Sequence, residues 1–483
     1  MGLKKQTYIA LLWSFIDRAG DQIVRFVFSI VLARLLMPAD FGLVGMACVI
    51  VEISKVFAQG GLGLGLINKK NATRVDESSV FFTNIVLGIA TTLLLYFSAS
   101  MVGKFYKNEL ITPLVKALSW GVLLNSIGNI QTVLMTKNID FKVQTIVSVS
   151  VTLVAGGTGI GLAYMGMGVW ALVWQGLIRS FLYSSLMWLV YSWRPSFCVS
   201  FSSIKNMFNF GYKVMLGNLA QIIYNNIFTI LIGKLFSPAQ LGYYTRAQQT
   251  QQLPLDTIWT IIWRVTFPVM STIKNDDERF RQALAHASKN LAFVLFPSLI
   301  MGVMVAPGLF RILFGEKWVP SIFIFQILCL SSLCLPLENL RNSAILAKGN
   351  SALQLKLITT KYVTTILSVF VTFRFGITVM LVGIGIVWYL NFLLNCFFTK
   401  KEIGYRLRWQ FLDLFPCMIC TLLSAAAIYL LSLFLNTYSI AAVASELFCG
   451  LFVYIATCYI LNVDVFFDNL KLVSRLVDKF KNG

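Results

Sequence analysis

Apolar residues occur along this chain in long blocks, and short stretches that hold most of the polar and charged residues separate them. Each block is close to the roughly 20 residues that an α-helix needs to cross the hydrocarbon core of a bilayer. Because that core offers no hydrogen-bond partners, a spanning segment has to satisfy its own backbone N–H and C=O groups, as a helix does. The pattern therefore predicts an all-α polytopic membrane protein with about 14 transmembrane helices. We expect them at residues 13–36, 41–66, 79–103, 112–136, 143–165, 169–191, 209–235, 242–271, 288–312, 321–347, 354–376, 378–399, 411–434 and 439–462.

Composition supports the membrane class. Hydrophobic residues make up 57% of the 483 residues, charged residues make up 12%, and the mean hydropathy is +0.76. A soluble domain carries about 25% charged residues, so the charged fraction here is about half of that value. The pI near 9.6 does not indicate a nucleic-acid partner, because the basic residues are spread over many loops and form no single face. Lys4 and Lys5 lead directly into the first block, so we expect no cleaved signal peptide.

Lysine and arginine residues are distributed unequally between the two sets of loops. The loops on the side of the N-terminus, together with the tail, hold 24 of them, whereas the loops on the opposite side hold 8. Short cytoplasmic loops carry the excess of Lys and Arg in membrane proteins. We therefore expect both termini to lie in the cytoplasm.

One short phrase occurs twice, as ARLLMPADFG at residues 33–42 and as GKLFSPAQLG at residues 233–242. Both copies follow an apolar block and end on the non-cytoplasmic side, so we expect Pro and Gly to form a sharp turn between two helices. An even number of predicted helices separates the copies, which indicates two parallel repeats related by an axis along the membrane normal.

The repeat predicts how the chain is organised. Weaker similarities at corresponding places, such as residues 105–113 with 313–320, extend the duplication beyond the turn. We expect two pseudo-symmetric six-helix bundles that are followed by two extra C-terminal helices. The predicted parts are an N-terminal bundle at residues 1–203, a C-terminal bundle at 204–405, two additional transmembrane helices at 406–462 and a basic cytoplasmic tail at 463–483.

Several motifs, in a fixed order, carry a resemblance to a known family. They are LARLLMPADFGLVGMA (32–47), LINKK (66–70), TKNIDFK (136–142), GMGVWALVWQGL (166–177), WRPSF (193–197), NNIFTILIGKLFSPAQLGYYTRAQQ (225–249) and FGEKWVPS (314–321). With these motifs the chain resembles the Wzx-type polysaccharide exporters, which are the lipid-linked oligosaccharide flippases of the multidrug/oligosaccharidyl-lipid/polysaccharide (MOP) superfamily. The resemblance covers residue 1 to about residue 460.

The resemblance implies a fold and a function. The fold would be a V formed by the two bundles in a bacterial inner membrane. The function would be to carry an undecaprenyl-pyrophosphate-linked oligosaccharide from the cytoplasmic to the periplasmic leaflet by alternating access, for O-antigen, capsule or exopolysaccharide synthesis. The implied partners are this lipid-linked oligosaccharide, the membrane lipids, an H⁺ or Na⁺ gradient and a polysaccharide polymerase. The two extra helices would form a groove for the polyprenyl tail, and the alternative is that they only pack against the bundle.

Among the charged side chains of the apolar blocks, we take seven cations and five anions as the interior set. Such charges are costly in a membrane and usually face a bundle interior or a water-filled cavity. The cations are Arg18, Arg25, Lys55, Arg179, Arg246, Arg264 and Arg341, and the anions are Asp17, Asp21, Glu52, Asp256 and Glu338. Because a guanidinium fork binds phosphate oxygens in a bidentate manner, we expect this mildly cationic set to bind the pyrophosphate, with Gln and Asn side chains on the sugars.

Some of these charges have a structural alternative. Charges near the end of a block could pair locally and extend toward a membrane face, and these are Asp17, Arg18 and Glu52. Arg246 could lie at the outer interface, and the charges after Pro336 could only stabilise a kink. Arg25 and Arg264 lie deeper in their blocks, and for them we favour a role in binding.

Carboxylates inside the blocks are also the candidates for coupling transport to an ion gradient. The three candidates are Asp21, Asp256 and Glu338. The block at residues 209–235 holds Lys213 but no carboxylate, so we expect no simple proton or sodium site there.

The sequence does not indicate an enzyme, a metal site or a cofactor. Its single histidine, His286, provides neither a multi-histidine metal centre nor a Ser-His-Asp triad. The glycine-rich stretches lack the spacing of a nucleotide fingerprint, and no Walker sequence is present. A multidrug cation antiporter of the same superfamily stays open as the alternative, although the interior charges are mainly basic. A polysaccharide polymerase or glycosyltransferase would need longer outer loops than the dozen or so residues available here.

Overall fold

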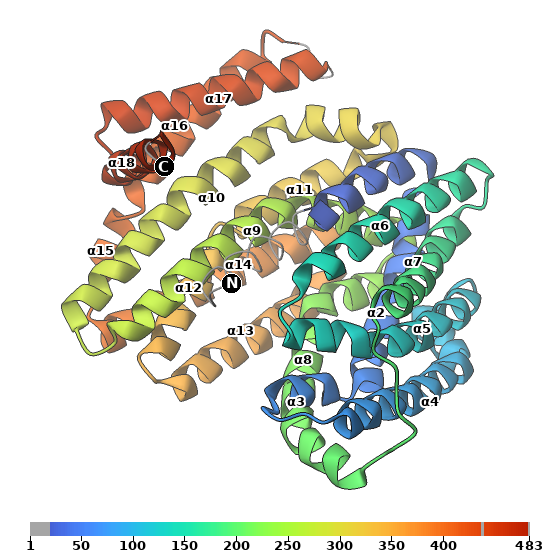
Figure 1. The fold of residues 1–483 in the computed structure, drawn as a ribbon. Helices are drawn as coiled ribbons and strands as arrows, with labels where there is room; N and C mark the ends of the chain where they lie inside the picture. Colours follow the sequence, from blue (N-terminus) through green and yellow to red (C-terminus); the bar gives the residue numbers. More distant parts are fainter. Residues whose placement is uncertain (1–19, 436–438, 482–483) are drawn as a thin grey trace. The chain divides into compact units, whose positions relative to one another are not determined.

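The computed structural model describes residues 20–435 and 439–481, and every regular element in them is a helix (Figure 1). The first described helix covers residues 20–35. The others are α2 (Pro38–Gln59), α3 (Leu62–Asn68), α4 (Arg74–Tyr106), α5 (Ile111–Lys137), α6 (Phe141–Tyr164), α7 (Val169–Val190), α8 (Phe201–Leu235), α9 (Pro238–Thr272), α10 (Asp277–Phe314), α11 (Pro320–Ser331), α12 (Leu335–Ala347), α13 (Ser351–Thr372), α14 (Ile377–Ile403), α15 (Leu407–Leu412), α16 (Phe415–Ser432), α17 (Ile440–Ile460) and α18 (Asp464–Lys481). Short 3₁₀ turns lie at Glu316–Trp318 and Phe373–Phe375.

The helices confirm an all-α polytopic membrane protein. Ten helical stretches of the described residues are long and apolar enough to cross a bilayer. The expected total of about 14 crossings stays a prediction. The expected tight connection between residues 165 and 168 is present, because α6 ends at Tyr164 and α7 begins at Val169.

The helix expected at residues 41–66 is interrupted, so that expectation is wrong, and the helix expected at 321–347 is interrupted close to Pro336, where a kink was anticipated. The first breaks between α2 and α3, where Gly60 and Gly61 have φ values of 54° and 69°. This left-handed region is open to glycine and strained for other residues. The second breaks between α11 and α12, where Pro336 lies in the first turn of α12 and has no N–H to continue a helix.

The chain divides between Thr245 and Arg246 into two compact units. We describe each unit by itself. The sequence predicted a boundary between two six-helix bundles after residue 203. That boundary stays a prediction.

The helices of the first unit pack closely because small residues face each other. A Cβ added to Gly88 of α4 would lie 2.5 Å from Oγ of Ser126 on α5. A Cβ added to Gly128 of α5 would lie 2.5 Å from Oγ of Ser184 on α7. In a bilayer, where apolar burial drives helices together only weakly, close approach of this kind supplies the packing energy. Along the other side of α2 and α3 runs α8.

The repeated phrase has the same local structure in both copies. A helix ends, two residues form the turn, and a proline occupies the first position of the next helix. In the first copy the Met37 N–H donates to Oδ2 of Asp40 at 2.9 Å, and in the second the Ser237 N–H donates to Oε1 of Gln240 at 3.3 Å. Asp40 therefore stabilises a helix N-terminus, which accounts for an acid in an apolar stretch.

The glycines of the phrase lie inside helices, so the expectation that they form the turn is wrong. They bring the two copies into contact. A Cβ on Gly42 would lie 1.8 Å from the carbonyl oxygen of Pro238, and a Cβ on Gly242 would lie 1.9 Å from the carbonyl oxygen of Pro38. The contact is reciprocal, and each glycine is needed because its partner is a backbone atom that a side chain cannot displace.

In the second unit, α10 packs against α11, α16 and α17, while α16 and α17 also pack against each other. The Tyr454 hydroxyl of α17 donates to the carbonyl oxygen of Phe293 on α10 at 2.8 Å. The expected basic tail contains the helix α18, whose Asn469 amide donates to Oδ1 of Asn290 at 3.1 Å.

Alanine at Gly42 tests the contact between the two copies of the phrase. We expect Gly42→Ala to lower the free energy of unfolding by about 1–3 kcal/mol, because α2 and the start of α9 would have to move apart. Gly45→Ala is the matched control, since the nearest atom lies 3.7 Å from its Cβ position. Thermal unfolding of the purified protein in detergent measures the difference. Equal unfolding temperatures for the two variants would contradict the contact.

Candidate functional site

One buried carboxylate in the first unit holds two arginines. Oδ2 of Asp21 lies 2.7 Å from a guanidinium nitrogen of Arg25 and 3.3 Å from one of Arg179 on α7. The Thr152 hydroxyl on α6 donates to Oδ1 of Asp21 at 2.5 Å. The Asp21 side chain is 9% exposed, whereas those of Arg25 and Arg179 are 51% and 37% exposed. The carboxylate is therefore fully bonded inside the protein, while both cations keep an accessible side.

Local sequence explains this arrangement. Asp21 and Arg25 are four residues apart, so they lie on one face of a helix. Thr152 lies one turn before Gly156 on α6, and a Cβ on Gly156 would lie 2.4 Å from the ring of Phe28. This glycine lets the helix of residues 20–35 lie directly on α6, which brings the Thr152 hydroxyl within reach of Asp21.

The Asp21 cluster, which we define as Asp21, Arg25, Arg179 and Thr152, carries a surplus positive charge. Two guanidinium groups face one carboxylate, so one charge stays uncompensated within it. A guanidinium has five N–H donors, and Asp21 uses only some of them. The remaining donors form rigid forks whose geometry fits phosphate oxygens. The cluster can therefore bind an anion without losing its internal support.

Among the described residues, Lys55 is the other predicted site residue of the first unit, and it lies outside the Asp21 cluster. Arg18 and Asp17 lie outside the described residues. Lys55 is half-buried on α2, one turn after Glu52, which accepts a hydrogen bond of 3.2 Å from the Asn226 amide of α8.

The predicted site residues of α9 fall into two kinds of environment. Arg246 is buried, and its guanidinium carbon lies 5.0 Å from the ring centre of Phe314 and 5.2 Å from that of Trp318. This aromatic packing is typical of a structural arginine. Asp256 and Arg264 are exposed, and neither forms an ion pair within the described part of the chain.

Glu338 and Arg341 of α12 belong to a buried network in the second unit. Oε2 of Glu338 lies 3.0 Å from Nζ of Lys361 on α13, and its Oε1 accepts a hydrogen bond of 3.4 Å from the Asn395 amide of α14. Arg341 donates from Nε to Oε1 of Gln410 at 3.0 Å. Glu338 and Arg341 are both fully buried, so this network faces protein on all sides.

The network continues to the short helix α15. The Gln410 amide donates to the carbonyl oxygens of Tyr405 and Cys396 at 2.6 and 3.0 Å. Burial raises the pKa of Tyr405, so its hydroxyl keeps its proton and donates to Asp413. Asp413 in turn lies 3.0 Å from Nζ of Lys289 on α10.

Lys361 falls inside the expected helix at 354–376, but it was counted among the cytoplasmic loop cations and not among the interior charges, and that assignment is wrong. The residue lies well inside α13, is 10% exposed in its side chain and neutralises Glu338. The sequence did not reveal this, because α13 begins at Ser351, before the apolar block that was predicted at 354–376. Lys361 lies about three turns inside α13, and hydropathy alone does not distinguish a buried lysine at that depth from one near the helix end.

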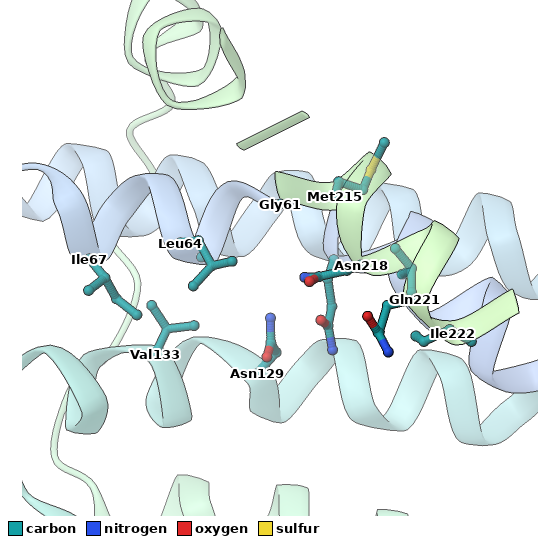
Figure 2. Close-up of a pocket in the computed structure, with 12 residues that line it drawn as sticks. Gly61, Leu64, Ile67, Asn129, Val133, Met215, Asn218, Gln221 and Ile222 are labelled. Atoms are coloured by element: carbon teal, nitrogen blue, oxygen red, sulfur yellow. The ribbon is translucent and has the colours of Figure 1, made fainter. Parts of the chain in front are cut away.

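A second feature of the first unit could not be found from charge. A cavity of about 400 Å³ lies where α2 and α3 meet α5 and α8, and Figure 2 shows residues that line it. The residues around it are Val56, Gln59, Gly61, Gly63, Leu64, Ile67, Asn129, Val133, Met215, Asn218, Gln221 and Ile222. Its polar side chains are four amides from three helices, and no sequence spacing connects them.

Comparison with known proteins places the chain. Residues 31–323 match the family model of the polysaccharide biosynthesis proteins. The chain belongs to this family. Its members are membrane transporters and not enzymes, which confirms the expected class and the resemblance on which it was based.

Curated relatives of this family are similar over most of the chain. The teichuronic acid biosynthesis protein TuaB of Bacillus subtilis is 26% identical over 353 residues, which is 73% of each chain. The lipopolysaccharide biosynthesis protein WzxC of Escherichia coli is 23% identical over 74% of this chain and 73% of its own. The succinoglycan biosynthesis transport protein ExoT of Rhizobium meliloti is 23% identical over 66% of this chain and 65% of its own.

Two solved structures share the fold of this chain. The lipid II flippase MurJ, in an inward closed conformation, matches 94% of this chain and 99% of its own with a TM-score of 0.76 and 16% identity. An inward-facing multidrug transporter of the MATE family matches 79% of this chain and 94% of its own with a TM-score of 0.63 and 14% identity. The chain therefore shares the fold of these two transporters.

Removing the cation of the buried pair tests the network of the second unit. We expect Lys361→Met to lower the free energy of unfolding by about 3–5 kcal/mol, because Glu338 would stay buried without its partner. The double variant Glu338→Gln/Lys361→Met should recover most of this loss. Lys356→Met, at an exposed position of α13, is the control. The pairing would be contradicted if Lys361→Met unfolded at the same temperature as Lys356→Met.

Proposed function

We propose that this protein is a flippase that moves an undecaprenyl-pyrophosphate-linked oligosaccharide from the cytoplasmic to the periplasmic leaflet by alternating access. The observation that carries the proposal is the Asp21 cluster, which holds two arginines around one buried carboxylate. The family match and the transport function in the name of its relative ExoT support it. The transporter would lie in a bacterial inner membrane, and the flipped oligosaccharide would be used to synthesise a surface polysaccharide.

The chemistry of the cluster fits a pyrophosphate. A pyrophosphate carries several negative oxygens in a small volume, and charge-assisted hydrogen bonds from guanidinium forks are among the strongest that proteins make. Arg25 and Arg179 each keep an accessible side next to a carboxylate that orients them. Lys55, Arg246, Arg264 and Arg341 were expected in the same site, and their environments give them no comparable orientation, so we assign them no contact with the headgroup.

The membrane arrangement is part of the proposal. It has 14 crossings, with both termini in the cytoplasm because of the excess of Lys and Arg on that side. The two halves are parallel repeats, and the reciprocal contacts of Gly42 with Pro238 and Gly242 with Pro38 support this. Alternating access then requires the two bundles to separate first on one side of the membrane and then on the other.

Asp21 gives this transporter a means of coupling to an ion gradient. While it is charged, its carboxylate occupies donors of both arginines. A proton on Asp21 would remove the charge that holds them and leave the two guanidinium groups to the pyrophosphate. Glu338 and its partner Lys361 are both buried, whereas the two arginines of Asp21 are accessible, which makes Glu338 a weaker candidate.

Flipping in proteoliposomes tests the function. The substrate is an undecaprenyl-pyrophosphate-linked oligosaccharide, and the readout is access of its sugar to a lectin added outside. We expect Arg25→Ala and Arg179→Ala to slow flipping by about 10- to 100-fold, which is the loss expected for charge-assisted hydrogen bonds. Arg374→Ala, at an exposed position outside the cluster, should flip at the wild-type rate.

Two results would contradict this assignment. If both cluster variants flipped the substrate at the wild-type rate, the pyrophosphate headgroup would not bind at the Asp21 cluster. Efflux of organic cations by the wild type, without transport of the lipid-linked sugar, would favour the multidrug antiporter whose fold this chain shares.

An imposed pH gradient tests the role of Asp21. We expect the gradient to accelerate wild-type flipping, because protonation of Asp21 releases both arginines. Asp21→Asn carries no charge to titrate, so its flipping rate should not depend on the gradient. The control is Glu109→Gln, at an exposed position outside the cluster, which should keep the wild-type response. The role of Asp21 is wrong if Asp21→Asn responds to the gradient as the wild type does.

A further inference from the structure

The cavity between α2, α3, α5 and α8 has a chemistry of its own. Four amide side chains line it, and among the described residues around it none is charged. The amides are Gln59 of α2, Asn129 of α5, and Asn218 and Gln221 of α8. Figure 2 shows Asn129 and Asn218 pointing into the space between α5 and α8. The volume of about 400 Å³ lies in the usual range of ligand pockets, which is about 300–1,000 Å³.

These amides have free hydrogen-bonding capacity. Gln59, Asn129 and Asn218 have no hydrogen-bond partner within the described part of the chain, and Gln221 donates only to Oδ1 of Asn225 at 3.0 Å. Asn125, one turn before Asn129, instead donates to Gly121 and Ser180 at 2.6 and 3.0 Å. Gln59, Asn218 and Gln221 are exposed and Asn129 is half-buried, so these amides are accessible to a ligand, whereas Asn125 is used in helix packing.

The base of the cavity is held by glycines. Gly61 has a φ of 69°, and its Cβ position lies 2.2 Å from the carbonyl oxygen of Gly211 on α8. The Cβ position of Gly63 lies 2.8 Å from Cγ2 of Val133 on α5. These contacts fix α3 against both neighbouring helices. The distance between the amides of α5 and α8 is therefore set by the fold.

We propose that this amide cavity is the subsite that binds uncharged sugar residues of the transported glycan. Each amide offers two N–H donors and an acceptor with two lone pairs, and each sugar hydroxyl offers one donor and two acceptor lone pairs. The apolar side chains beside the amides provide surface for the C–H groups of a pyranose ring. This inference rests on the proposed function, because it assigns the part of the same substrate that the Asp21 cluster does not bind.

Other ligand classes fit the cavity less well. A pyrophosphate needs cations, and an organic cation needs an acid, and the cavity lining provides neither. A polyprenyl tail would leave four amides without partners in an apolar contact, which is unfavourable for each of them. A neutral polyhydroxylated ligand is the class that satisfies the whole lining.

Binding to purified protein in detergent tests the assignment with two probes. One probe is undecaprenyl pyrophosphate, and the other is the same lipid carrying a neutral trisaccharide. The variant Asn129→Leu/Asn218→Leu keeps the side-chain volume and removes both amides. We expect the wild type to bind the glycosylated lipid more tightly than the bare one. The variant should lose about tenfold in affinity for the glycosylated lipid, as two neutral hydrogen bonds predict, and keep its affinity for the bare lipid.

Two further variants keep this experiment decisive. Asn209→Leu, at an exposed position of α8 outside the cavity, should bind both probes as the wild type does. Gln221→Met, at an exposed position that lines the cavity, replaces the double variant if the latter does not elute as a single species.

Each outcome separates the sugar subsite from the proposed function. Equal affinity of the wild type for both probes, or unchanged affinities of the variant, would overturn the sugar subsite and leave the flippase intact. An equal loss for both probes would also overturn it, because the amides would then act on the fold and not on the sugar. Failure of the wild type to bind either probe would overturn the proposed function and the subsite together.

Discussion

A carboxylate inside an apolar helix is stable only when the protein itself meets its charge, because lipid and packed side chains cannot solvate it. This chain meets the requirement in two ways. Glu338 receives one lysine and one amide in a place where both charges are buried, so the pair is complete. Asp21 receives two arginines and a hydroxyl, and the arginines extend to where they are accessible. The Glu338 arrangement stabilises the packing of α12 against α13. The Asp21 arrangement leaves one positive charge available for a ligand.

The same constraint explains how much of the site was predictable. Charges in apolar blocks stand out in a sequence, so Asp21, Arg25 and Arg179 could be named as interior residues. Their grouping could be anticipated only within one helix, from the spacing of Asp21 and Arg25. The contribution of Thr152 could not be anticipated, because its hydrogen bond to Asp21 depends on the close contact between Gly156 and Phe28. Arg246 was recognised as an interior charge, but its aromatic partners lie about 70 residues away.

The fold was predictable wherever length and hydropathy decide it, and unpredictable wherever single backbone contacts do. Apolar blocks located the helices. They did not locate the interruption at Gly60 and Gly61, because two glycines in an apolar block resemble ordinary packing glycines. The repeated phrase was recognised as a duplication, but its glycines were assigned to the turn. Their actual role is visible only when Gly42 and Pro238 are seen in contact.

The amide cavity shows why charge alone is an incomplete guide to a transporter of this class. A pyrophosphate is the same group whichever glycan it carries, so a cluster that binds only the pyrophosphate cannot distinguish one glycan from another. Discrimination requires groups that read hydroxyl positions, and an amide that loses its hydrogen-bond partner with the wrong sugar makes that sugar less favourable. Such groups are neutral and come from separate helices, as Gln59, Asn129 and Asn218 do here. With anchoring assigned to the Asp21 cluster and selection to the amides, a change of glycan would require new amide positions and no change in the arginines.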